Sequence, residues 1–418
     1  PIMVAAQEPV GTAAVKTIGV TGTATKAGSG YVVIGGRKVL DGKSYAFNYD
    51  NGDTATDVAL AITNAINNVN GCAYDAVANA GDVTLTAKFK GLNSDVSLSL
   101  DFVAHSNGLT YAITDTTAGT GVPTVTDSLS ATGDEWVTLV LNTYSPESTA
   151  VLDELQAFNG KPSALPTGNY TGIDWKPFIA ITGVVTQAQL AVSEPYADGE
   201  IDETTNAFAP AFGSGGMCYE AAANYVAITA PFAQNNPHLD IIKQTLPDMP
   251  SPIDMVLAKP SYDRRDELVN KGHSTMVWNG NAYEIIDFVT TYHAVEDTSP
   301  IFMYVRDLII DMNMNYSYIL RQRMFVYGKV LVPDSDVPPS KIQGSSIQPK
   351  TWKSLVYDIL DDFQARGLIV DTDFSKESIQ VEINSTNPNR LDTTFNYKRS
   401  GIARIASTNV FAGAYFGN

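Results

Sequence analysis

Histidine and cysteine would be the easiest residues to assign to chemistry, and their spacing argues against a catalytic or metal site. The four histidines are His105, His238, His273 and His293. None has a second histidine or a cysteine three or four residues away, as ligands on one helical turn require. Cys72 and Cys218 are too far apart for a zinc site or a disulfide framework, and we expect free thiols. We therefore predict no catalytic residue, no metal ligand and no cofactor.

Two short runs imitate binding loops. Asp371-Thr372-Asp373-Phe374-Ser375, with Glu382 at the twelfth position, resembles a calcium loop, but Lys376 stands where glycine is required. Gly213–Gly216 precedes a predicted helix, as in a phosphate-binding turn, but lacks the Lys-Ser/Thr pair. Turn-forming residues are the simpler explanation of both runs.

The composition favours a protein that works within an assembly. Charged residues make up only 17% of the chain, and interfaces are depleted of charge at their centres. The formal net charge of −18 would repel phosphate, so we expect no direct contact with nucleic acid. No apolar run approaches the about 18 residues of a membrane-spanning helix, so we expect no membrane insertion.

A β-rich module is predicted between residues 18 and 122. Short apolar runs alternate there with turn residues, with hairpins expected at Asp41-Gly42 and at Ala80-Gly81. One helix is predicted over 54–69, because Thr54 and Asp57 form a capping box. Its apolar stripe consists of Val58, Ile62 and Ile66.

An α/β core is predicted to follow over residues 123–260. Apolar runs at 136–141 and 177–185 predict buried strands. Helices are expected over 146–158, from 186, and over 217–230. Strands that alternate with helices favour a parallel or mixed sheet.

A third block is predicted over residues 261–400, followed by a C-terminal strand or arm over 401–418. Asn279-Gly280 predicts a hairpin, and Ser299-Pro300 predicts the start of a long helix that Gly328 can end. A second helix is expected over 349–366 and a half-buried strand over 378–384.

Two surfaces in this block are candidates for contacts with other proteins. Asp358, Asp361 and Asp362 lie away from the apolar face of the second helix, either as a solvated face or as an acidic docking patch. The segment 401–416 is apolar and has no helix caps, so a lone strand there would be prone to aggregate. The residues predicted to pair with another subunit are Ile402, Ile405, Val410, Phe411, Tyr415 and Phe416.

Several motifs resemble those of contractile phage tail sheath proteins, and the whole chain resembles the Mu-type branch. They are Thr245-Leu246-Pro247-Asp248-Met249-Pro250, Asp266–Gly272, Thr290-Thr291-Tyr292 and Asn387-Pro388-Asn389-Arg390-Leu391-Asp392. The module resembles the inserted domain of that family. Pro250 stands before Ser251 where the family usually has glycine, and residues 234–238 fit only approximately.

The resemblance implies an α+β multidomain fold: an α/β core, an inserted β-rich outer module and an α+β sheath domain that faces the tube. It implies a virion subunit without enzymatic activity, assembled in the host cytoplasm, that forms stacked hexameric rings and contracts to drive the tube through the host envelope. The implied partners are other copies, the tail tube protein, and baseplate and tail terminator proteins. Asp358, Asp361 and Asp362 are the candidate contacts with the tube.

Two other interpretations remain open. The Thr- and Asn-rich module would suit an adhesin or a carbohydrate-binding virion protein, and an α/β core can support a hydrolase. Residues 1–17 are expected to begin the core domain. Because family members start with an extended arm and part of the core sheet, we also expect an N-terminal segment that this chain does not include.

Overall fold

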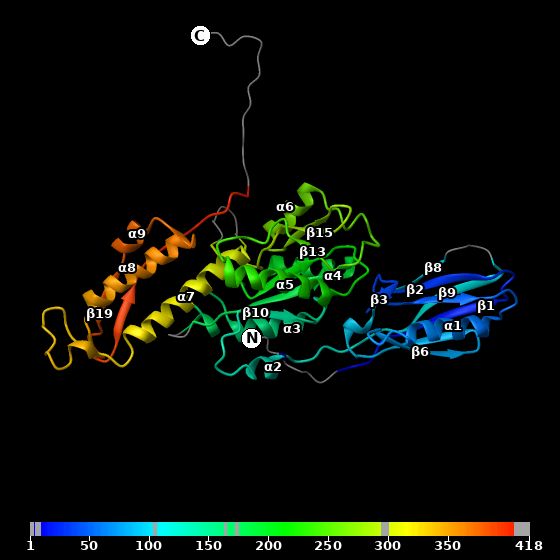
Figure 1. The fold of residues 1–418 in the computed structure, drawn as a ribbon, viewed down its shortest axis with the longest axis horizontal. Helices are drawn as coiled ribbons and strands as arrows, with labels where there is room; N and C mark the ends of the chain where they lie inside the picture. Colours follow the sequence, from blue (N-terminus) through cyan, green and yellow to red (C-terminus); the bar gives the residue numbers. More distant parts are fainter. Residues whose placement is uncertain are drawn as a thin grey trace, which may run out of the picture. The chain divides into compact units, whose positions relative to one another are not determined.

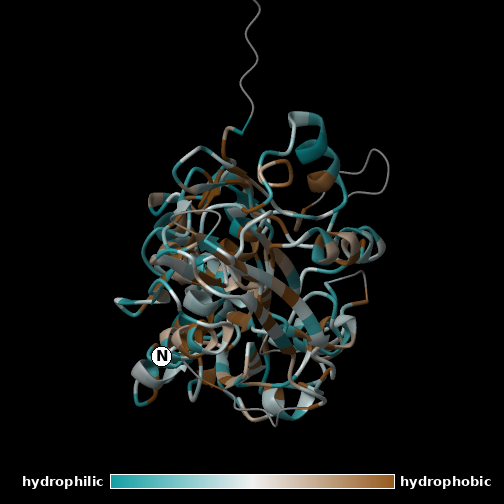
Figure 2. Cartoon of the chain, turned by 90° about the vertical axis from the view of Figure 1, so that its right-hand side faces the viewer, coloured by the Kyte–Doolittle hydropathy of each residue, from teal (hydrophilic) through white to brown (hydrophobic). Residues whose placement is uncertain are grey.

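The computed structural model describes residues 4, 10–102, 107–162, 165–171, 175–293 and 301–404. The chain forms two compact units, one of residues 1–231 with 241–308, the other of residues 232–240 with 309–418. Helices and several small sheets occur in both units (Figure 1), so the predicted α+β multidomain fold class is confirmed. Hydrophobic and hydrophilic stretches alternate within single elements (Figure 2), as expected when each element buries one face.

The β-rich module of the first unit contains two sheets and one long helix. The sheets have the strand orders β6-β7-β1-β9 and β5-β2-β8. The elements are β1 (Val15–Gly22), β2 (Gly28–Ile34), β3 (Val39–Leu40), β4 (Lys43–Ser44), β5 (Ala46–Tyr49), α1 (Ala55–Asn67), β6 (Tyr74–Asn79), β7 (Asp82–Ala87), a 3-10 turn (Leu92–Ser94), β8 (Leu98–Phe102) and β9 (Leu109–Thr117). Both expected hairpins form, because β3 pairs with β4 and β6 pairs with β7.

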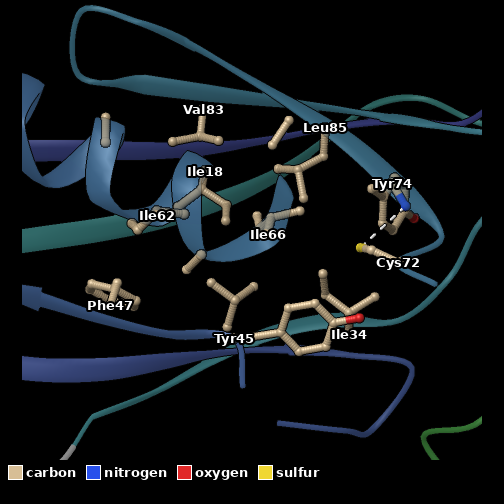
Figure 3. Packing of buried hydrophobic residues seen from close by; sticks show 14 of the residues in the cluster. Ile18, Ile34, Tyr45, Phe47, Ile62, Ile66, Cys72, Tyr74, Val83 and Leu85 are labelled. Carbon is tan, nitrogen blue, oxygen red and sulfur yellow. Dashed lines mark hydrogen bonds between the residues drawn. The ribbon is translucent and has the colours of Figure 1, made fainter. Parts of the chain in front are cut away.

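Helix α1 is the centre of the module's core. The capping box is present, with the amide of Asp57 donating to the Thr54 hydroxyl and the amide of Thr54 donating to the Asp57 carboxylate. Ile62 and Ile66 are fully buried; they lie between Ile18, Val83 and Leu85 of one sheet and Phe47 and Tyr45 of the other (Figure 3). The four-residue repeat read from the sequence therefore builds the contact between α1 and both sheets.

The strand β1 crosses the predicted boundary at residues 17 and 18. It begins at Val15 and lies between β7 and β9, and Ala14, Ile18 and Val20 are buried in the module core. Residues 15–17 therefore pack with the module, because the alternation of buried side chains starts before the change in composition.

The α/β core of the same unit has a three-stranded parallel sheet in the order β10-β11-β12. Its elements are α2 (Thr126–Ser130), β10 (Leu139–Asn142), α3 (Thr149–Asn159), a 3-10 turn (Gly168–Tyr170), β11 (Ile179–Val184), α4 (Gln187–Gly199), β12 (Asn206–Pro210) and α5 (Cys218–Asn235). The sequence did not predict β12, whose residues Asn-Ala-Phe-Ala-Pro have little β propensity. Burial on all sides makes it a strand.

A small antiparallel sheet in the order β13-β15-β14 completes the first unit. It contains β13 (Thr245–Leu246), β14 (Thr275–Trp278) and β15 (Tyr283–Asp287), preceded by α6 (Tyr262–Asn270). The turn at Asn279-Gly280 joins β14 to β15 as predicted, with Gly280 at φ 101°.

The long helix α7 (Val305–Phe325) starts later than predicted. The expected cap at Ser299-Pro300 lies outside the described residues. Before α7, the amide of Thr290 donates to the Met303 carbonyl at 2.8 Å, and Tyr304 forms a β-bridge with Val289. This pairing holds residues 303–304 extended, so the helix cannot begin before Val305.

The second unit packs short strands against α8 (Pro349–Ala365), which starts at proline as predicted. The other elements are β16 (Val330–Leu331), a 3-10 turn (Gln343–Ser345), β17 (Ser346–Ile347), β18 (Ile369–Val370), α9 (Thr372–Glu377), β19 (Gln380–Ile383), β20 (Leu391–Thr394) and β21 (Lys398–Arg399). The apolar face of α8 is buried as expected, except that Leu355 is only partly covered.

Candidate assembly surfaces

The acidic face of α8 is exposed. Asp358, Asp361 and Asp362 point away from the side on which Trp352 and Phe363 are buried. Asp361 accepts an ion pair from Lys376 Nζ at 2.5 Å, and Asp362 lies 4.0 Å from Arg366. Within the described residues, Asp358 has no ion-pair partner. Two of the three charges are therefore partly compensated, and Asp358 is the most available for a partner.

The C-terminal segment is attached to the second unit as far as Arg404. Strand β21 pairs antiparallel with β18, and the amide of Ser400 donates to the Leu368 carbonyl at 3.0 Å. Ile402 is half-buried, and the Arg404 guanidinium forms an ion pair with Asp240. Of the predicted pairing residues, Ile405, Val410, Phe411, Tyr415 and Phe416 lie outside the described residues, so their pairing stays a prediction.

The strands of the second unit occur in pairs with open edges. The pairs are β16 with β17, β18 with β21, and β19 with β20. Within the described part of the chain, none of these pairs has a third strand. Two-stranded sheets are marginally stable alone, and their free edges can accept a strand from another chain. These edges are the clearest assembly feature of the unit.

The hairpin β19–β20 is ordered by its turn. The Asn384 side-chain oxygen accepts from the amide of Asn387 at 2.8 Å, and its side-chain nitrogen donates to Asp392 at 2.7 Å. This bond, with a second from Arg390, holds the pKa of Asp392 below its usual value. The sequence analysis predicted β19 and missed β20. The signal was a turn-rich Asn-Pro-Asn between two alternating runs.

The one histidine–serine contact that resembles a nucleophile and its base lies deep in the first unit. Ser193 Oγ is 3.0 Å from His273 Nε2, and His273 Nδ1 is 2.8 Å from the Ser274 carbonyl. Both side chains are fully buried, and Phe208 stacks on the imidazole with ring centroids 4.9 Å apart. Burial lowers the pKa of His273 to about 4. The imidazole is therefore a neutral core group that no substrate can reach in this conformation.

The calcium-like run belongs to a helix start. The Asp371 carboxylate accepts from the amide of Phe374 at 3.3 Å and so caps α9, while Glu382 lies on β19. Within the described residues, no group of three potential metal ligands comes together. Among the described helices, none has the length and apolarity needed to cross a bilayer. Cys72 and Cys218 are both buried thiols.

Comparison with known proteins gives a relative that spans nearly the whole chain. The Mu-like prophage FluMu tail sheath protein of Haemophilus influenzae is 24% identical over 409 residues, which cover 93% of this chain and 77% of that protein. The chain resembles a Mu-like tail sheath protein. The resemblance read from the motifs is therefore confirmed. No family model matches the chain.

A solved structure of a sheath tail protein from Desulfitobacterium hafniense is also similar. It shares 12% identity over 94% of this chain and 82% of that chain, with a TM-score of 0.41. At this score the likeness adds nothing to what is concluded about the fold.

The sheath-like motifs occupy defined positions in the fold. Thr245-Leu246 form β13, Asp266–Gly272 closes α6, and Asn387–Asp392 makes the β19–β20 turn. Beside the second motif, Arg264 donates to Glu194 at 3.0 and 2.5 Å, and Lys271 approaches it at 2.8 Å. These hydrogen bonds lower the pKa of Glu194 to about 2 and tie α6 to α4.

Proposed function

We propose that this chain is a structural, non-enzymatic subunit of a contractile tail sheath in a virion, assembled in the host cytoplasm. In the proposal, copies form stacked hexameric rings around a tail tube and contract to drive the tube through the host envelope. The observation that carries the proposal is the similarity to a Mu-like tail sheath protein along 93% of the chain.

Strand addition would join the subunits. The open edges of the paired strands, above all β19 and β20, offer unpaired backbone donors and acceptors. The apolar segment 405–416 of a neighbouring copy would supply a complementary strand. Backbone hydrogen bonds along an edge can persist while domains rotate, so subunits would stay connected during contraction.

Contraction of such a lattice requires two alternative packings of the same subunits and no nucleotide. The tube would contact the 261–400 domain, with Asp358, Asp361 and Asp362 as the candidate residues. The β-rich module would project outward, and baseplate and tail terminator proteins would bind the two ends of the polymer.

Negative-stain electron microscopy of the purified chain tests the proposal. We expect polysheaths or striated tubes whose amount rises with protein concentration. A chain that stays a monodisperse monomer at every concentration and salt condition would contradict it.

A further inference from the structure

The parallel sheet of the first unit ends in an open edge at β10. Its order is β10-β11-β12, and the amide of Ile179 on β11 donates to the Thr138 carbonyl at 3.0 Å. Because backbone groups in a strand alternate in direction, those of Leu139 and Leu141 face the opposite side. Within the described residues, no strand pairs with β10 on that side. Parallel sheets are normally buried, so this edge is incomplete.

An apolar groove runs along the same edge. A cavity of about 410 Å³ is lined mainly by apolar side chains of α2, β10 and α3, including Leu129, Leu139, Leu141, Val151 and Leu155. Leu139, Val140 and Leu141 are each only half-buried, whereas every residue of β11 is buried. The groove has the length and chemistry for an extended apolar segment.

The N-terminal segment reaches this groove. Val4 stands at its rim, with 89% of its side chain exposed. Val10 lines a neighbouring cavity of about 330 Å³ together with Thr143 and Tyr144, which follow β10. The chain therefore passes toward the carboxyl end of β10 between residues 4 and 10. A strand at residues 2–6 would be parallel to β10, like the rest of the sheet.

We propose that residues 2–6 bind in this groove as a fourth strand of the parallel sheet, supplied by the same chain. The run Ile2-Met3-Val4-Ala5-Ala6 is uncharged and apolar, as a strand buried on both faces requires. Residues 1–3 and 5–9 lie outside the described residues. Thr12 is already fixed to Thr120 by two backbone hydrogen bonds of 2.9 and 3.1 Å, which keeps the segment beside the groove. This inference does not depend on the proposed sheath function.

Disulfide trapping tests the pairing. Val4→Cys is combined in turn with Leu139→Cys, Val140→Cys or Leu141→Cys, because neighbouring strands bring Cα atoms within disulfide range. The control pair is Val4→Cys with Val77→Cys, which is 65% exposed on the module. We expect one or more of the β10 pairs to close at least tenfold faster than the control. In a mixture of ¹⁵N-labelled and unlabelled chains, the cross-linked peptides should be labelled on both sides or on neither.

Two results would overturn the proposal. Mixed-label cross-links would show that a second copy supplies the strand, and failure of all three β10 pairs would show that residues 2–6 lie elsewhere. Hydrogen exchange gives a second measurement on the single variant Val4→Asp. The amides of Leu139 and Leu141 should exchange at least tenfold faster, while the Ile179 amide, bonded to Thr138, should not change. Unchanged exchange at Leu139 and Leu141 would also refute the inference.

Discussion

Arg37 of the β-rich module grips Glu220 of the α/β core. Its Nη1 lies 2.8 Å from both carboxylate oxygens, and its Nη2 donates to the Asp248 carbonyl at 2.7 Å. Glu220 is in the first turn of α5, where its carboxylate also accepts from the amide of Met217 at 2.9 Å. Next to this pair, a Cβ on Gly36 would come within 3.0 Å of the Gly215 Cα, so the two backbones touch. One ion pair and one close backbone contact thus attach the module to the core.

The first prediction concerns this attachment. Arg37→Ala should lower the free energy of unfolding by about 1–3 kcal/mol, because the Glu220 carboxylate loses its charged partner while only 22% exposed. A double-mutant cycle with Glu220→Ala should give a coupling of about 1 kcal/mol in urea unfolding. The control is Lys38→Ala, whose partner Asp101 is 50% exposed and whose loss should cost less than about 0.5 kcal/mol. A coupling near zero would show that the pair does not hold the module.

The second prediction concerns the buried carboxyl group of Glu203. Oε1 accepts from the amide of Thr205 at 2.5 Å, and Oε2 has no partner among the described residues. Burial raises the pKa of Glu203 to about 7, from an ordinary value of 4.5. Below pH 4.5 the group is protonated in both states, whereas above pH 7 the folded state carries a buried charge. Ionisation therefore costs up to about 3 kcal/mol at pH 8 and nothing at pH 4.

Glu203→Gln should accordingly raise the free energy of unfolding at pH 8 and leave it nearly unchanged at pH 4. The gain should be below about 3 kcal/mol, because the new amide group brings donors that need partners. Urea unfolding at the two pH values measures it, with the exposed Glu135→Gln as control. An equal effect at both pH values would contradict the role of ionisation.

The third prediction separates folding from assembly at the C-terminus. Deleting residues 405–418 keeps the β18–β21 pairing and the Arg404–Asp240 ion pair. The free energy of unfolding should change by less than about 0.5 kcal/mol, while polysheaths should disappear from electron micrographs. Replacing Val410, Phe411, Tyr415 and Phe416 by serine should act like the deletion, and alanine at Ser407, Thr408 and Asn409 should not. Tubes of normal length from the deleted chain would refute pairing between subunits.

The fourth prediction concerns the acidic face of α8. Changing Asp358, Asp361 and Asp362 to asparagine should reduce co-sedimentation with the tube protein at least tenfold and weaken its salt dependence. Stability should fall by no more than about 1 kcal/mol, because the ion pairs that Asp361 and Asp362 make are exposed. Asparagine at three exposed module carboxylates, Asp50, Asp75 and Asp82, is the charge-matched control. Equal loss in both variants would indicate a general charge effect and no specific tube contact.

The fifth prediction uses the closeness of the two ends of the module. Thr12 and Thr120 form a β-bridge, so joining them directly removes residues 13–119 with little strain on the core. The shortened chain should still form polysheaths if the module only projects outward. Its urea unfolding serves as the control that the core remains folded. A folded shortened chain that forms no tubes would show that the module is required for assembly.

The sequence by itself determined the elements whose signals are local. The capping box of Thr54 and Asp57, the Asn279-Gly280 turn and the apolar face of α8 each depend on residues within a few positions of one another. The order of its motifs also sufficed to predict the resemblance to tail sheath proteins, which the comparison confirms.

Only the tertiary structure decided what depends on distant residues. Strand β12 exists because its neighbours bury it, and α7 begins at Val305 because Tyr304 pairs with Val289. Arg37 and Glu220 are 183 residues apart, and the raised pKa of Glu203 comes mainly from burial. Such effects arise from packing and desolvation, which a residue's own neighbours in sequence do not specify.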